Sequence, residues 1–255
     1  MDTATDTTRK FCEMLRGSER VVFFGGAGVS TESGILDFRS EGGIFKALRA
    51  YGEAPEVLLS HSFFTAHPET FYRYYKENLL VTDALPNRAH IALARLEECK
   101  KLTSVITQNI DGLHQKAGSK NVLELHGSIY RNHCMKCGKE YPVSTVQNAP
   151  GVPRCGCGGI IKPDVTLYEE MLPDGVFEAA VREVECADML IVGGTSLVVY
   201  PAAGLVRYYR GHKLVLINKG TTEYDGRADL MLHTPIGEFL GSALLNDDNT
   251  LKELL

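Results

Sequence analysis

Two largely apolar stretches of this sequence lead into side chains that could do chemistry. Residues 105–107 are followed closely by Asn109 and Asp111. Residues 122–125 are followed directly by His126. Such runs predict buried strands of a parallel sheet, and ligands of open α/β sheets lie beyond the carboxyl ends of the strands. We therefore expect these side chains on one side of a sheet, where an imidazole can accept a proton at neutral pH. Taken singly, each could also be a loop cap or a surface residue.

A glycine-rich turn follows another predicted strand, residues 20–24. The turn contains Gly26-Ala27-Gly28, the start of a dinucleotide-binding fingerprint, but Thr31 stands where the third glycine would be. Glycines at this place let the backbone approach a phosphate closely, and Ser30 and Thr31 could add hydroxyl donors. A partial fingerprint also fits an ordinary strand-to-helix turn. The stretch 32–43 predicts a long loop.

Four cysteines form two close pairs, Cys134 with Cys137 and Cys155 with Cys157. This spacing predicts a structural zinc site of four thiolates on two loop knuckles. Four protein ligands close the coordination shell, so we assign the zinc to folding rather than to chemistry. His133, beside the first knuckle, could compete as a ligand.

Two further predicted strands, residues 189–192 and 213–217, end in polar groups. The first is followed by Gly194, Thr195 and Ser196 and the second by Asn218. With the glycine turn, these groups could hold the two ends of one dinucleotide. Asn218 could equally be a turn residue.

The order of predicted elements indicates an α/β fold, a Rossmann-like doubly wound parallel sheet, because buried strands alternate with helical patterns. Between residues 128 and 163 the composition changes to cysteine, glycine and proline, which indicates a small inserted module. The helical patterns cover residues 7–15, 68–80, 88–99, 113–116, 176–184, 202–209 and 236–245.

Composition limits the functional classes. With 255 residues, 44% of them hydrophobic, the chain can bury a large core, and its net charge of −5 argues against a general nucleic-acid binder. Seven cysteines, four of them clustered, fit a reducing compartment better than a disulfide framework. The polar, acidic first residues and the lack of a long apolar run predict a cytoplasmic protein without membrane contact.

Together these motifs make the sequence resemble the sirtuins, NAD-dependent protein-lysine deacylases, and in particular their bacterial deacetylase branches. The matching motifs occur in the family's order at residues 26–30, 34–40, 107–111, 126–127, at the four cysteines and at 194–196. The resemblance implies NAD as cofactor, one structural zinc, acetylated-lysine proteins as substrates and no direct nucleic-acid partner. It also implies a Rossmann-like domain and a smaller domain that combines a helical insertion with a zinc-ribbon module. The Rossmann-like domain would comprise residues 1–43, 81–127 and 164–255, the insertion 44–80 and the zinc module 128–163.

The resemblance also implies roles for particular residues. His126 corresponds to the general base that acts on a ribose hydroxyl, with Asn109 as a second catalytic residue and Asp111 at the nicotinamide carboxamide. The products would be nicotinamide, free lysine and O-acetyl-ADP-ribose. The implied NAD-binding residues are Gly26, Ala27, Gly28, Ser30, Thr31, Asp37, Phe38, Arg39, Gln108, Asn109, Ile110, Asp111, His126, Gly194, Thr195, Ser196, Asn218 and Ile236.

The segment that would bind the substrate peptide departs from the family pattern. The family's usual valine followed by Phe-Gly-Glu is replaced here by residues 165–170, which lack the glycine, so we expect a different loop. The peptide is still expected to add as a β-strand, held mostly by main-chain hydrogen bonds. The expected substrate-binding residues are Val165, Leu167, Tyr168, Leu197 and Val198.

The acyl group is predicted to be neutral, an acetyl or a somewhat longer alkyl chain. Sirtuins that prefer acidic acyl groups carry a Tyr-x-x-Arg pair, whereas Arg49 and Tyr51 occur here in the opposite order and at another spacing. Two alternatives remain open at this point. A protein mono-ADP-ribosyltransferase would share every cofactor residue, and a non-catalytic NAD-sensing or zinc-ribbon module would need no catalytic histidine.

Overall fold

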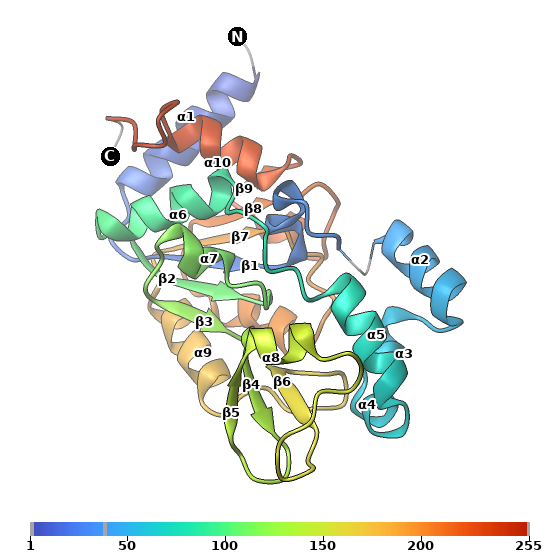
Figure 1. Ribbon diagram of the computed structural model, residues 1–255. Coiled ribbons are helices and arrows are strands. Elements are labelled where there is room, and N and C mark those ends of the chain that lie inside the picture. Colours follow the sequence, from blue (N-terminus) through green and yellow to red (C-terminus); the bar gives the residue numbers. More distant parts are fainter. Residues whose placement is uncertain (1–2, 38–39, 254–255) are drawn as a thin grey trace.

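The computed structural model describes residues 3–37 and 40–253 of the chain (Figure 1). Six strands in this part form one parallel sheet in the order β3-β2-β1-β7-β8-β9. This is the doubly wound order of dinucleotide-binding domains, so the predicted fold class is confirmed. The strands are β1 (Val21–Gly25), β2 (Leu102–Thr107), β3 (Val122–Glu124), β7 (Met189–Gly193), β8 (Leu214–Ile217) and β9 (Leu230–Leu232).

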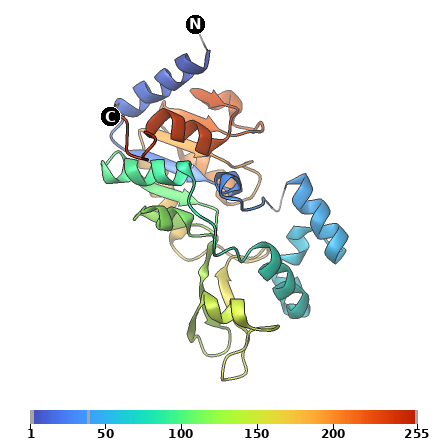
Figure 2. The same cartoon turned by 45° about the horizontal axis from the view of Figure 1, so that its top comes forward.

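Helices cover both faces of this sheet, as two views show (Figures 1 and 2). On one face, a core that includes Phe11, Leu93 and Leu240 joins the sheet to α1 (Thr3–Arg16), α6 (Arg88–Glu98) and α10 (Ile236–Leu244). On the other, Val184 and Leu205 pack α9 (Val176–Cys186) and η3 (Ala202–Tyr208) against the strands. The central strands β1, β2, β7 and β8 are almost entirely buried, which explains their largely apolar sequences.

A smaller region lies below the sheet in Figure 1. It contains an antiparallel sheet in the order β5-β4-β6 and a group of short helices. One hydrophobic core joins the short helices to the antiparallel sheet, since Phe71 and Tyr72 cluster with Ile129 and Ile161. Its elements are α2 (Glu41–Tyr51), α3 (Pro55–Leu58), α4 (His61–Ala66), α5 (Pro68–Asn78), β4 (Gly127–Cys134), β5 (Glu140–Pro142), α8 (Val143–Asn148) and β6 (Ile161–Val165).

Several local expectations differ from the structure. The stretch 32–43 is not one long loop, because α2 already begins at Glu41, where the Ser40 hydroxyl oxygen accepts the Gly43 amide at 3.2 Å. Short 3₁₀ turns, η1 (Ala27–Val29) and η2 (Thr31–Ser33), follow β1, and residues 202–208 form a 3₁₀ helix. The helix α7 (Leu113–Ala117) lies as expected beyond β2.

Among the described residues, no helix combines the length and apolar character that crossing a membrane requires.

Candidate active site

The strands of the large sheet end level with one another. Gly25, at the end of β1, pairs with Thr107 on one side and Gly193 on the other. Thr107 pairs in turn with Glu124, and Gly193 with Ile217. The loops after β1, β2, β3, β7 and β8 therefore open at one edge of the sheet, as the sequence predicted. The strand order reverses between β1 and β7, and dinucleotides bind at such a crevice in doubly wound folds.

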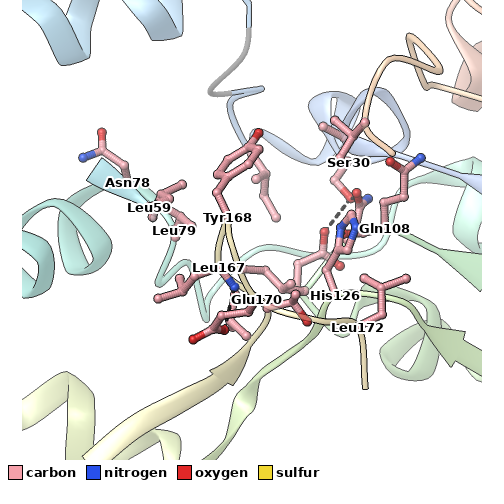
Figure 3. Close-up of a pocket in the computed structure, with 18 of the residues that line it drawn as sticks. Ser30, Leu59, Asn78, Leu79, Gln108, His126, Leu167, Tyr168, Glu170 and Leu172 are labelled. Atoms are coloured by element: carbon pink, nitrogen blue, oxygen red, sulfur yellow. Dashed lines mark hydrogen bonds between the residues drawn. The ribbon is translucent and has the colours of Figure 1, made fainter. Parts of the chain in front are cut away.

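A cavity of about 210 Å³ opens at this edge, between the sheet and the smaller region (Figure 3). The predicted residues that line it are Ala27, Ser30, Gln108, Asn109, Ile110, Asp111, His126, Val165, Leu167 and Tyr168. The expected NAD-binding and peptide-binding segments thus face each other across one space.

Three polar side chains at this edge are linked by hydrogen bonds. The Ser30 hydroxyl donates to Asp111 Oδ2 at 2.7 Å, and Asn109 Nδ2 donates to Ser30 Oγ at 3.0 Å. Asp111 Oδ1 accepts the Leu113 amide at 2.9 Å, at the start of α7. Ser30, expected at a phosphate, therefore holds the amide and the carboxylate in place.

Asp111 is a buried carboxylate in this cluster. Burial raises its pKa above the usual 3.8, the Leu113 amide and the Ser30 hydroxyl lower it, and the charge of Glu124 raises it further. Burying a charged acid costs stability, so a protein keeps one mainly where it has a function. Acids with perturbed pKa values are therefore frequent at functional sites.

His126 is oriented by the chain around it. Its Nδ1 lies 3.0 Å from the Gln108 carbonyl oxygen. A carbonyl can only accept, so Nδ1 carries the hydrogen, and Nε2 is the basic nitrogen of the neutral ring. The next residue, Gly127, has φ +74°, and a Cβ there would lie 1.9 Å from the Asp164 carbonyl oxygen. Because Gly127 has no side chain, β4 can begin in close contact with β6 directly after His126, which lines the cavity.

The glycines of the two central loops pack against each other. The Gly28 amide donates to the Gly194 carbonyl at 2.8 Å, and a Cβ on Gly28 would lie 2.8 Å from Gly194 Cα. Gly194 has φ +58°, and a Cβ there would lie 2.4 Å from the Val29 nitrogen. Gln108 Nε2 donates to Thr195 Oγ1 at 3.0 Å and so connects the β2 and β7 ends. These glycines are required by loop packing alone, whatever else they contact.

Other predicted residues lie near this edge without lining the cavity. Asn218 Nδ2 donates to the Gly220 carbonyl at 2.9 Å, which is the turn function considered above. The Thr31 hydroxyl donates to the Gly28 carbonyl at 2.9 Å, and Ile236 is a core residue packed against Gly193. Phe38 and Arg39 lie outside the described residues. Five other predicted residues do not line the cavity either: Gly26, Asp37, Ser196, Leu197 and Val198.

Sequence reasoning missed much of the cavity wall. Leu59, from the smaller region, and Leu79, just after α5, line the cavity together with Leu172 (Figure 3). The helical pattern of 68–80 predicted α5, but it gave no signal that the end of this stretch reaches the cavity. Thr166, Glu169 and Glu170, which belong to the predicted peptide-binding segment, also line the cavity. The other lining residues that were not predicted are Ile35, Leu36, Asn78, Val199, Tyr200 and Pro201.

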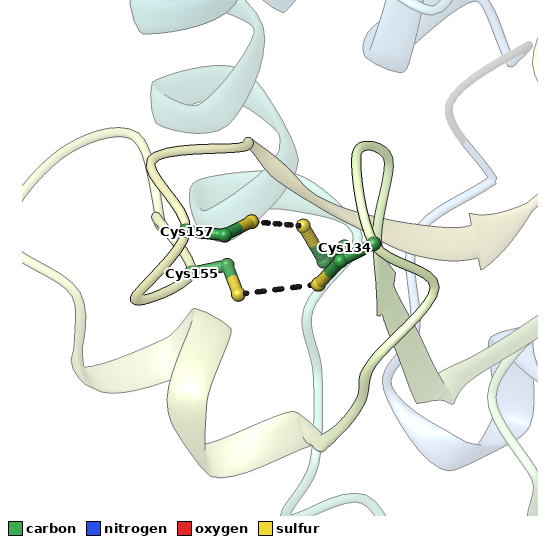
Figure 4. A group of neighbouring side chains, drawn as sticks. Cys134, Cys155 and Cys157 are labelled. Carbon is green, nitrogen blue, oxygen red and sulfur yellow. Dashed lines mark hydrogen bonds between the residues drawn. The ribbon is translucent and has the colours of Figure 1, made fainter.

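The four cysteines come together in the smaller region (Figure 4). Their sulfur atoms all lie within 4.8 Å of one another, with Cys134 Sγ 3.5 Å from Cys157 Sγ and Cys137 Sγ 3.6 Å from Cys155 Sγ. Tetrahedral zinc with Zn–S bonds of about 2.3 Å holds its sulfurs about 3.8 Å apart, so the cluster fits this metal. The Tyr141 hydroxyl donates to Cys155 Sγ at 3.0 Å, as outer groups around metal thiolates often do.

Comparisons with known proteins agree with this fold. A model of the Sir2 family matches residues 26–201, more than half of the chain. A NAD-dependent protein deacetylase of Clostridium acetobutylicum is 53% identical over 241 residues, 94% of this chain and 98% of that protein. The corresponding protein of Clostridium perfringens is 55% identical over 241 residues, 94% of this chain and 99% of that one.

Solved structures extend the likeness to three dimensions. A structure of Sir2 with p53 peptide and NAD⁺ is 39% identical, with a TM-score of 0.81, covering 92% of this chain and 96% of that one. A structure of Sir2 bound to acetylated peptide is 38% identical, with a TM-score of 0.80 and the same coverage. This chain belongs to the Sir2 family, and the resemblance read from its motifs is confirmed.

Proposed function

We infer that this protein is an NAD-dependent protein-lysine deacetylase. The observation that carries the inference is the cavity that His126, Asn109 and Asp111 share with the peptide-binding segment. The deacetylases named above agree with this activity over nearly the whole chain. The overall reaction consumes NAD, acetyl-lysine and water, and it yields nicotinamide, free lysine and O-acetyl-ADP-ribose.

His126 is proposed as the general base. Bound NAD would supply a ribose carbon that becomes electrophilic as nicotinamide departs, which the acetyl oxygen can then attack. The Gln108 carbonyl keeps the proton of His126 on Nδ1, so Nε2 can take a proton from a ribose hydroxyl. Asn109 would orient the ribose, because Ser30 holds its amide at the cavity wall.

Asp111 is proposed to bind the nicotinamide carboxamide, with the backbone of Ile110. A carboxylate accepts hydrogen bonds from an amide NH₂, and both oxygens of Asp111 are already fixed by Ser30 and Leu113. A rigid acceptor in a dry site loses little energy to reorganisation when the carboxamide must be held.

The remaining NAD-binding residues stay proposals, and those that the structure describes are supported by their place at or near the β1–β7 crevice. We propose that Gly26, Gly28 and Gly194 bring backbone close to the phosphates and that Thr195 and Asn218 lie on the adenosine side. The rest of this proposed set is Ala27, Thr31, Asp37, Phe38, Arg39, Gln108, Ser196 and Ile236.

The smaller domain is proposed to comprise residues 44–80 and 128–163. Its shared core supports this division, although α2 begins slightly earlier, at Glu41. Bound zinc would tie the two cysteine knuckles together and take no part in the reaction, because four thiolates leave no open position. A site built of thiolates also supports a cytoplasmic location, where they stay reduced.

The test is deacetylation of an acetyl-lysine peptide with and without NAD, followed by mass spectrometry and by nicotinamide release. One nicotinamide should appear for each acetyl group removed, and turnover that ignores the removal of NAD would reject the proposal. A gain of mass on the target would instead indicate ADP-ribosylation. Peptides carrying acetyl, butyryl and succinyl groups test the predicted preference for a neutral acyl group.

A further inference from the structure

The peptide-binding segment keeps a glycine-like backbone at a position that has no glycine. Glu169 has φ +75°, in the left-handed region that residues other than glycine seldom adopt. When Glu170 is matched to the glutamate of the family's Phe-Gly-Glu pattern, Glu169 takes the place of its glycine. A left-handed glutamate persists only where its surroundings hold it, so its contacts indicate what the position does.

Both carboxylate oxygens of Glu169 are bound by a single residue of the helical insertion. Oε2 accepts the Ser62 amide at 2.9 Å, and Oε1 accepts the Ser62 hydroxyl at 3.0 Å. Two hydrogen bonds to one carboxylate fix its direction as well as its distance. Residues 59–62 and 167–170 are far apart in sequence, so this contact ties two separate segments of the cavity wall.

The same two segments are also joined by backbone hydrogen bonds. The Tyr168 carbonyl accepts the His61 amide at 3.0 Å, and the Tyr168 amide donates to the Leu59 carbonyl at 3.0 Å. The first amides of a helix have no partner within the helix. In α4 the segment 168–169 satisfies two of them, those of His61 and Ser62, so the helix and the loop stabilise each other.

We propose that Glu169 is a positioning residue for the acyl-lysine peptide, which it serves by holding the loop 167–170 against Ser62. The inference rests on the proposed deacetylase function. Figure 3 shows Leu167, Tyr168 and Glu170 on one wall of the cavity, while Gln108 lies on the other. Loss of the contact should therefore weaken the binding of the peptide and leave the binding of NAD unchanged.

Neighbouring contacts keep the loop folded when Glu169 is altered. Glu170 accepts the Leu167 amide at 2.9 Å and Lys162 Nζ at 3.0 Å, and its carboxylate lies 2.9 Å from His61 Nδ1. These contacts hold the base of the loop. The Glu169→Gly variant removes the side-chain anchor and suits the left-handed backbone, so it separates the anchor from the backbone strain.

The experiment compares the wild type with Glu169→Gly, Glu169→Gln and Ser62→Ala, using Glu185→Gln as a matched surface control. Labelled acetyl-lysine peptide is titrated by fluorescence anisotropy, and kcat and KM are measured for peptide and for NAD. We expect Glu169→Gly to raise the peptide Kd and KM about three- to tenfold with KM for NAD unchanged. Glu169→Gln and Ser62→Ala should give smaller increases, since each retains one of the two hydrogen bonds. In the double variant Glu169→Gln/Ser62→Ala, the fold-increase in peptide KM should be smaller than the product of the two single-variant increases.

Hydrogen exchange of the segments 59–66 and 165–171 tests the contact independently of activity. Faster exchange in Glu169→Gly but not in Glu185→Gln, together with weaker peptide binding, supports the proposal. Unchanged exchange, or faster exchange with an unchanged peptide KM, overturns it while the wild type still deacetylates its peptide. If the wild type neither binds nor deacetylates the peptide, the proposed deacetylase function is itself rejected. Failure of the Glu169 proposal alone is therefore distinguishable from failure of the proposed function.

Discussion

The two sides of the β1–β7 crevice are built differently. On the β2 side, by which we mean the loops after β1, β2 and β3, polar side chains bond to one another, as Ser30 does to Asn109 and Asp111. On the β7 side, the loops after β7 and β8, the backbone of Gly194 packs against Gly28 and Val29, and the Asn218 side chain closes its own turn. We therefore propose that the β2 side carries the chemistry and that the β7 side shapes the crevice. Substitutions on the first should reduce turnover, and those on the second should reduce stability or NAD affinity.

Replacing the proposed base should give the largest effect. His126→Ala removes the proton acceptor, and we expect deacetylation to fall about 10³-fold or more. The half-buried ring lines the cavity rather than a core cluster, so Tm should change by less than about 3 °C. The measurement is peptide deacetylation beside thermal unfolding, with the exposed His212→Ala as control. Retention of more than a tenth of the wild-type rate would remove His126 from the β2-side chemistry.

Asp111→Asn should separate activity from stability. We expect turnover to fall about 100-fold, because the carboxylate that accepts the carboxamide is lost. Stability at pH 7 should not fall, because the substituted side chain carries no charge to bury, while its amide oxygen could still accept the Leu113 amide.

The wild type and Asp111→Asn should differ in how their stability depends on pH, because the pKa of Asp111 is raised in the folded state. Between the usual value of 3.8 and the raised value, the folded state binds more protons than the unfolded state, so stability falls as pH rises. Acidification from about pH 7 towards pH 4 should therefore stabilise the wild type relative to Asp111→Asn. Urea unfolding of both proteins measures the difference. A variant that is less stable by more than about 2 kcal/mol at pH 7 would mean that Asp111 serves the fold.

Much of the β2 side could be predicted because parallel strand ends share an edge. Apolar runs located β2 and β3, so the residues that follow them, Asn109 and His126, had to lie together. The bond between Ser30 and Asp111 could not be predicted, since it depends on how two loops pack. The place of Leu79 at the cavity could not be predicted either, because it depends on how the smaller region packs against the sheet. The start of α2 was missed because Gly42 and Gly43 lie in its first turn, and glycine has a low helix propensity.

On the β7 side the next effect should be one of stability. In Gly194→Ala the new Cβ would lie 2.4 Å from the Val29 nitrogen, at a φ of +58°. We expect a loss of about 2–4 kcal/mol, from backbone strain and crowding together. Gly175 is the matched control, since its φ is +73° and nothing lies within 4 Å of an added Cβ. Gly175→Ala should cost about 1 kcal/mol, from backbone strain alone. Equal losses in chemical denaturation would show that the loop contact across the crevice is not tight.

Asn218→Ala should give the smallest effect and decides what the β7 side contributes. Its side chain donates to the Gly220 carbonyl at 2.9 Å in a half-buried turn, while its backbone amide keeps a bond to Leu232 at 3.0 Å. Loss of one such hydrogen bond costs about 1 kcal/mol or less. If Asn218 also contacts the adenosine half of NAD, KM for NAD rises about two- to fivefold while kcat stays constant. An unchanged KM leaves the turn as its only function. A fall in kcat of more than about tenfold would place chemistry on the β7 side and end the distinction between the two sides.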